Sequence, residues 1–106
     1  MDAFYALAEP RRRRIIELIA ANGRLSATEI SKKFDITAQA ISQHLSVLLS
    51  AKLLIVHKHA QQRIYEINSN EMVEVEGWTE KTLKMWNERF DRLEEVLKEE
   101  KKKARK

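Results

Sequence analysis

The sequence predicts a mainly α-helical fold that carries one small β-hairpin. Apolar residues recur at helical spacing along most of the 106-residue chain. The chain contains only two glycines and one proline, so few positions interrupt a helix. Two β-prone runs, residues 54–59 and 63–67, are separated only by residues 60–62, which is typical of a hairpin. We expect about five helices and a two-stranded hairpin within a single domain, residues 1–106.

Residues 1–21 are expected to form two helices. Phe4 and Leu7 lie at helical spacing and predict a first helix over residues 2–9. Pro10 suits the first position of a second helix, because the N–H that proline lacks is not needed there. Gly23 is free to adopt the left-handed conformation and is expected to end this helix.

Residues 26–51 predict a helix-turn-helix. Ser26 and Glu29 have the spacing of a capping box, so a third helix begins here and is expected to stop near Asp35. Thr37 is the candidate N-cap of the next helix. We expect helices of about nine and fourteen residues, joined by a turn of about three. One face of the second helix is apolar, and the other carries uncharged polar side chains: Gln39, Ser42, Gln43 and Ser46.

The hairpin over residues 54–67 directly follows this helix and is therefore expected to be a wing. Because no glycine lies at its tip, the turn is expected to be wider than two residues and mobile. Residues 70–103 predict one long C-terminal helix. Its apolar residues step by three and four, the seam of a coiled coil, at Leu83, Trp86, Phe90, Leu93 and Leu97. A second apolar face lies beside this seam, so the helix needs two partners: the chain's own core and a second chain.

Charge and composition narrow the classes of function. The net charge is +4, and the basic excess lies in the N-terminal part: ten Lys/Arg against five Asp/Glu through residue 63, and ten against eleven from residue 64 onward. This distribution suits a polyanionic partner, although a basic solvated surface explains it equally well. The chain has no cysteine, no apolar run long enough to cross a bilayer and no secretory signal, so we expect a cytoplasmic protein. No nucleophile arrangement or glycine-rich phosphate loop indicates an enzyme, and no cofactor is expected.

The order of these elements resembles the ArsR-type winged-helix repressors, and within them the metal-independent members. The resemblance covers essentially the whole chain and rests on these matches: Phe4-x-x-Leu7-Ala8-Glu9-Pro10-x-Arg12-Arg13-x-Ile15, Ile30-Ser31-x-Lys33-Phe34, Ile41-Ser42-Gln43-His44-Leu45-x-x-Leu48, and the spaced Trp78, Trp86 and Arg92-Leu93-Glu94. The chain departs from the family at Lys52 and Ala60, where glycine is frequent, and at Gln61 and Gln62, where arginine is frequent. These departures concern the wing's contact with DNA more than the fold.

The resemblance implies a homodimer that binds double-stranded DNA at an inverted-repeat operator and represses transcription. Each recognition helix would enter a major groove, where Gln39 and Gln43 can pair with the N6/N7 edge of adenine. A solvated polar face is the alternative. The expected DNA-binding residues are Thr37, Ala38, Gln39, Ser42, Gln43, His44, Ser46, Lys58, His59, Gln61, Gln62, Arg63 and Arg12. Three roles stay open for His44: a contact with the DNA backbone, a contact that stabilises the fold, or a half-buried position with hydrogen bonds to its neighbours.

Two clusters leave alternatives open. His57 and His59 alternate along one strand and point to the same face, but two histidines fall short of the three or four ligands that zinc takes. No metal site is therefore expected. The cluster from Arg11 to Arg14 points in four directions on a helix, so its members cannot all face one partner.

The expected dimer contacts are Phe4, Leu83, Trp86, Phe90, Leu93 and Leu97. Two other functions stay open at this point. One is a sensor of the same fold, which would bind a small molecule near Trp78 and Trp86 or a metal at His57 and His59. The other is a winged-helix protein-interaction module that does not bind DNA.

Overall fold

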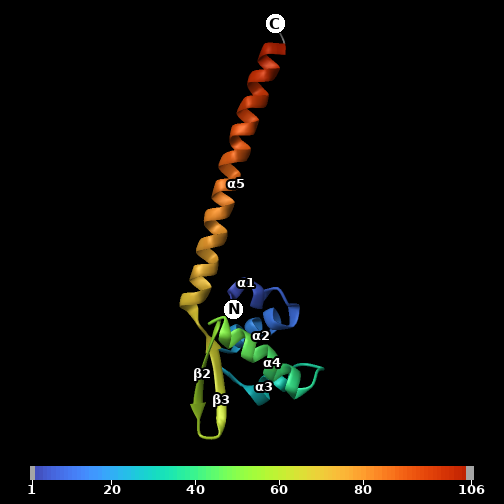
Figure 1. Cartoon of the computed structure of the whole chain (residues 1–106), viewed down its shortest axis with the longest axis vertical. Helices are drawn as coiled ribbons and strands as arrows, with labels where there is room; N and C mark the ends of the chain where they lie inside the picture. Colours follow the sequence, from blue (N-terminus) through green and yellow to red (C-terminus); the bar gives the residue numbers. More distant parts are fainter. Residues whose placement is uncertain (1, 105–106) are drawn as a thin grey trace. The chain divides into compact units, whose positions relative to one another are not determined.

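The computed structural model describes residues 2–104, and α5 carries the chain from one compact unit, residues 1–75, into a second, residues 76–106. The single domain expected over residues 1–106 stays a prediction. The elements follow one another in this order (Figure 1): α1 (Ala3–Leu7), α2 (Pro10–Asn22), β1 (Leu25–Ser26), α3 (Ala27–Lys32), α4 (Ala38–Ser50), β2 (Leu54–His59), β3 (Gln62–Ile67) and α5 (Ser69–Ala104).

The first two helices are set by their caps. The Asp2 side chain accepts a hydrogen bond from the N–H of Tyr5, and α1 ends at Leu7, earlier than the expected residue 9. The reason is Pro10, which disfavours helical backbone in the residue before it; Glu9 is extended and serves as the N-cap of α2. Gly23 closes α2 at φ 83°, as the sequence predicts.

The helix-turn-helix is formed by α3 and α4. Ser26 and Glu29 make both hydrogen bonds of the capping box, and Thr37 accepts from the N–H of Ala40 at 3.1 Å. Hydrogen bonds from the backbone and hydroxyl of Ser26 lower the pKa of Glu29. Both helices are shorter than expected, with 6 and 13 residues, and the turn between them covers residues 33–37. The turn is longer because Phe34 and Ile36 leave the helix to pack against the core.

The sheet has three strands in the order β1-β3-β2, so the two-stranded hairpin gains a strand that the sequence did not predict. In β1, Leu25 pairs with Tyr65 and Ser26 pairs with Ile64. All pairs are antiparallel. The strand consists of Leu25 and Ser26 alone, and its partner is remote in sequence, so no local pattern marks it.

The expected wide turn at the wing tip is wrong. His59 pairs with Gln62, so the turn consists of Ala60 and Gln61 alone. Ala60 adopts φ 56°, whereas Gln61 is not among the described residues with positive φ. A positive φ at the first central residue only is the φ pattern of a type II′ turn, which matches the twist of a hairpin. The alanine therefore takes a conformation that normally selects glycine.

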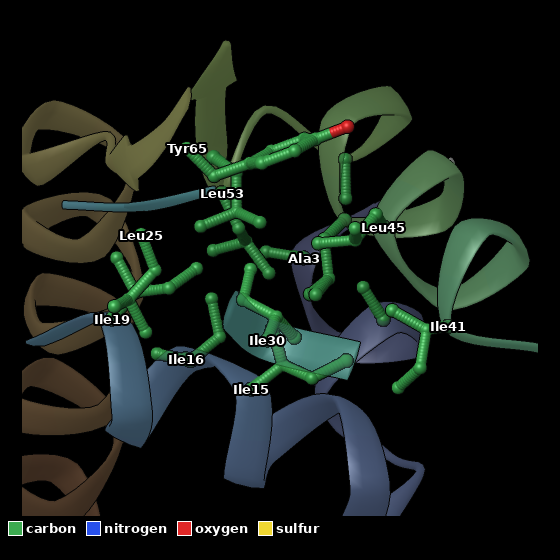
Figure 2. Close-up of a cluster of buried hydrophobic side chains, with 14 residues drawn as sticks. Ala3, Ile15, Ile16, Ile19, Leu25, Ile30, Ile41, Leu45, Leu53 and Tyr65 are labelled. Atoms are coloured by element: carbon green, nitrogen blue, oxygen red, sulfur yellow. The ribbon is translucent and has the colours of Figure 1, made fainter. Parts of the chain in front are cut away.

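One apolar core holds the first unit together, and Figure 2 shows its side chains converging from the helices and the sheet. The largest fully buried side chains are Ile15, Ile19, Ile30, Ile41, Leu45, Leu48 and Leu53. The prediction of a mainly helical winged helix-turn-helix with five helices among the described residues is confirmed. Over the same residues, no helix is long and apolar enough to cross a membrane.

Candidate nucleic-acid interface

The recognition helix α4 separates an apolar face from a polar one. Ile41, Leu45 and Leu48 are buried in the core. The opposite face is exposed and contains every polar residue that the sequence analysis assigned to it: Gln39, Ser42, Gln43 and Ser46, with Thr37 and Ala38 exposed at its start. Packing of the buried face therefore holds an uncharged surface of hydrogen-bonding groups outward. His44 lies between the faces and is half-buried.

The wing presents two different faces. Lys58 pairs directly with Arg63, and these two lie on the same face of the sheet as Tyr65. His59 pairs with Gln62 on the opposite face. All of these wing side chains except Tyr65 are exposed, as is Gln61 at the tip. The register thus places the two cations of the wing side by side.

Glu66 links the wing to Arg24, the residue that precedes β1. Its carboxylate accepts from Nε of Arg24 at 2.8 Å and lies 2.9 Å from Nε2 of His57. The hydrogen bond with His57 and the nearby Arg24 lower the pKa of Glu66, against the effect of partial desolvation. No sequence pattern indicates Arg24 or Glu66, because their contact depends on the β1–β3 pairing. His57 was predicted only as half of a pair of histidines that falls short of a metal site.

The arginine cluster at the start of α2 has partners within the chain. Arg12 donates from Nε to the carbonyl of Ala6 at 2.7 Å, and its guanidinium lies 5.6 Å from the ring centroid of Tyr5. Arg13 donates to the carbonyl of Leu7 at 2.7 Å. These two side chains satisfy carbonyls at the end of α1 that have no helical partner. The structure therefore gives Arg12 a role within the fold, and its contact with DNA stays a prediction.

A groove of about 370 Å³ lies between the helix-turn-helix and the wing. Its lining comes from α3, α4 and β3: Ala27, Thr28, Ser31, Ala38, Ile41, Ser42, Leu45, Arg63 and Tyr65. Only Ala38, Ser42 and Arg63 were among the residues expected at the DNA. Thr28, Ser31 and Tyr65 were missed because they belong to three separate segments that only the fold brings together.

The second unit consists of the later part of α5, and its seam residues are exposed. The exposed fraction is 64% for Trp86 and 51% for Phe90, and it is similar for Leu83, Leu93 and Leu97. On the first unit, Phe4 of α1 is 47% exposed. Within residues 2–104, no group of three or more His, Cys, Asp or Glu residues is placed to hold a metal ion.

Helices α3 and α4 form a helix-turn-helix whose second helix exposes a polar face, and a basic hairpin follows it. These features are typical of the winged helix-turn-helix class of DNA-binding proteins. Comparisons with known proteins support the same class. Residues 7–57 match the family model described as "Helix-turn-helix domain". The transcriptional repressor SdpR of Bacillus subtilis (strain 168) is 30% identical over 77 residues, which cover 73% of this chain and 84% of SdpR.

Solved structures resemble the chain over most of its length. The ArsR family transcriptional regulator RHA00566 has a TM-score of 0.71 at 26% identity, covering 79% of this chain and 86% of that one. An ArsR-like transcriptional regulator from Rhodococcus sp. RHA1 has a TM-score of 0.76 at 22% identity, covering 88% and 87%, and supports the fold alone. This chain belongs to the ArsR family of helix-turn-helix transcriptional regulators. It is a DNA-binding regulator of transcription, not an enzyme.

Proposed function

We propose that the chain is a homodimeric repressor that binds an inverted-repeat operator in double-stranded DNA and works in the cytoplasm without a metal-sensing site. The observation that carries the proposal is the exposed, uncharged face of α4 around Gln39 and Gln43. Glutamine donates and accepts at once, which matches the major-groove edge of adenine. A merely solvated face would tolerate charges, yet no charged residue occurs from Ala38 to Ser50.

The wing supports the proposal through its charges. Arg63 lines one groove with residues of the recognition helix, and Lys58 pairs with it across the hairpin, so these two exposed cations can contact phosphates or enter the minor groove. Contacts of this kind strengthen binding to every sequence, whereas contacts from α4 discriminate between bases.

The dimer is supported by the seam of α5. Five large apolar side chains at coiled-coil spacing are more than half exposed, and burying each one contributes on the order of 1.5–3 kcal/mol. A second copy supplies a matching surface by twofold symmetry. Two recognition helices would then reach successive major grooves about 34 Å apart. Repression is proposed from the relative SdpR, whose name describes it as a transcriptional repressor.

Base readout by α4 is tested with Gln43→Ala on an operator selected from random duplexes. We expect binding to weaken by about 1–3 kcal/mol and the preference at one base position to relax. Asn70→Ala is the control, because it removes an exposed amide at the start of α5. Lys58→Ala should instead weaken all duplexes alike and reduce the dependence on salt. If Gln43→Ala also weakened all duplexes alike, with no change in base preference, α4 would not read the sequence.

The dimer is tested by sedimentation of Trp86→Ala and Phe90→Ala. Each change removes an aromatic ring from the seam and should shift the monomer–dimer equilibrium toward monomer by at least tenfold. Glu95→Ala, on the charged side of the same helix, should leave the equilibrium unchanged. An unaltered profile for both aromatic variants would exclude the seam from the dimer contact.

A further inference from the structure

The groove between the helix-turn-helix and the wing has the chemistry of an anion site. Four of its lining residues carry a hydroxyl, Thr28, Ser31, Ser42 and Tyr65, and Arg63 adds a guanidinium. Among the described residues that line the groove, none carries a carboxylate. All the polar side chains of the lining can therefore donate hydrogen bonds to a ligand, and the one charge among them is positive. These polar groups favour an oxyanion over a cation.

Tyr65 gives the groove a hydroxyl that has no partner among the described residues. The residue is only 4% exposed, and its ring lies in the core on strand β3. Its hydroxyl oxygen lies at the far end of the ring and points toward α4 (Figure 2), where the side chain lines the groove. No described residue makes a hydrogen bond to this hydroxyl. Since no buried side-chain oxygen or nitrogen among the described residues lacks a partner, this hydroxyl is open to water in the groove, and an acceptor that enters the groove can take the place of that water.

The wing adds a second, independent indication. Lys58 and Arg63 stand directly opposite each other in the β2–β3 ladder, on the face that also carries Tyr65. Like charges in this position repel and destabilise the strand pair. Neither side chain has an ion pair with any described residue. A bound anion would relieve the repulsion.

The geometry of the duplex indicates which anion this is. The major and minor grooves of DNA are separated by one sugar–phosphate backbone. If α4 occupies a major groove and the wing reaches the adjacent minor groove, that backbone must cross between them. The groove has Ser42 of α4 on one side and Arg63 of β3 on the other, so the backbone would pass over it.

We propose that the groove binds a phosphate of the DNA backbone, with the Tyr65 hydroxyl and the Arg63 guanidinium as donors and the hydroxyls of Thr28, Ser31 and Ser42 around it. This inference rests on the proposed function and adds a contact that fixes how the duplex is seated. The contact carries no sequence information, because every nucleotide has the same phosphate.

The test is Tyr65→Phe, which removes only the hydroxyl, with Tyr5→Phe as the matched control on α1. Tyr65→Phe should weaken binding to every duplex about tenfold, leave base preference unchanged and leave the salt dependence unchanged, because no charge is lost. Arg63→Gln should weaken binding and also lower the salt slope by about one phosphate contact. Thermal unfolding should show the same midpoint for Tyr65→Phe and the wild type, since the hydroxyl has no partner in the chain.

Single methylphosphonate substitutions then locate the phosphate. Wild-type binding should fall when one particular phosphate is neutralised, and Tyr65→Phe should lose less than the wild type does when that same phosphate is neutralised. Inorganic phosphate, compared with chloride at equal ionic strength, should compete only weakly if the site takes backbone phosphate. If inorganic phosphate competed strongly with the duplex, and Tyr65→Phe abolished this competition, the ligand of the groove would be free phosphate and not the DNA backbone.

The outcomes separate the two proposals. If the wild type binds no duplex, the proposed function fails. If the wild type binds its operator and Tyr65→Phe binds it equally well, only the phosphate site is refuted.

Discussion

Replacing Lys52 by glycine should stabilise the protein, although lysine is the better helix former. Lys52 follows the last residues of α4 and adopts φ 63°, in the left-handed region. Its N–H bonds to the carbonyl of Leu49, and the N–H of Leu53 bonds to that of Leu48, both at 3.0 Å. These two bonds form a Schellman motif, in which the left-handed position is normally glycine.

The magnitude follows from two opposing terms. The left-handed conformation costs a residue with a Cβ about 1–2 kcal/mol. Glycine has greater freedom in the unfolded chain, and the loss of this freedom on folding costs about 0.5–1 kcal/mol. The Lys52 side chain is exposed and has no ion pair with a described residue, so its loss costs little. We expect a net gain of about 0.5–1 kcal/mol in the free energy of unfolding, or roughly 2–6 °C in Tm.

The assay is equilibrium unfolding in urea, with Lys33→Gly as the matched control. Lys33 is also an exposed lysine at the end of a helix, but its φ is −91°, where lysine is unstrained. Lys33→Gly should therefore lower the free energy of unfolding while Lys52→Gly raises it. If both substitutions destabilised the protein by the same amount, strain at Lys52 would not be the reason that glycine fits this position.

Two further predictions concern the wing. Ala60→Gly should slow hydrogen exchange of the β2 and β3 amides several-fold, because φ 56° at the first turn residue favours glycine; unchanged or faster exchange would count against strain at the tip. Glu66→Gln should lower the free energy of unfolding at neutral pH. Because the pKa of Glu66 is lowered in the folded state, its contribution is complete above the ordinary carboxyl pKa of roughly 4.3 and is lost as the pH falls below that value. Below roughly pH 5, the difference between wild type and Glu66→Gln should therefore shrink as the pH falls, and a difference that grew over that range would contradict the pairing with His57 and Arg24.

The helices could be predicted because their signals are local. Pro10, the Ser26–Glu29 capping box and Thr37 mark where three helices begin, and the structure confirms each start. Apolar spacing also identified the buried face of α4, which leaves its polar face outward. Helix ends were predicted less well. Helix α1 ends at Leu7 because of the following proline, and α3 ends at Lys32 because the residues after it pack against the core.

The sequence by itself thus determined the fold class, the helix starts and the polar character of the recognition helix, because each depends on residues within one or two helical turns. Only the tertiary structure decided what depends on remote pairs. The pairing of Leu25 with Tyr65 creates the third strand and aligns Arg24 with Glu66, and the fold places Tyr65 and Ser42 in the lining of one groove. Tertiary packing also holds Lys52 and Ala60 in conformations that their local preferences oppose. Such features follow from the free energy of the whole core, which outweighs local propensity at single positions.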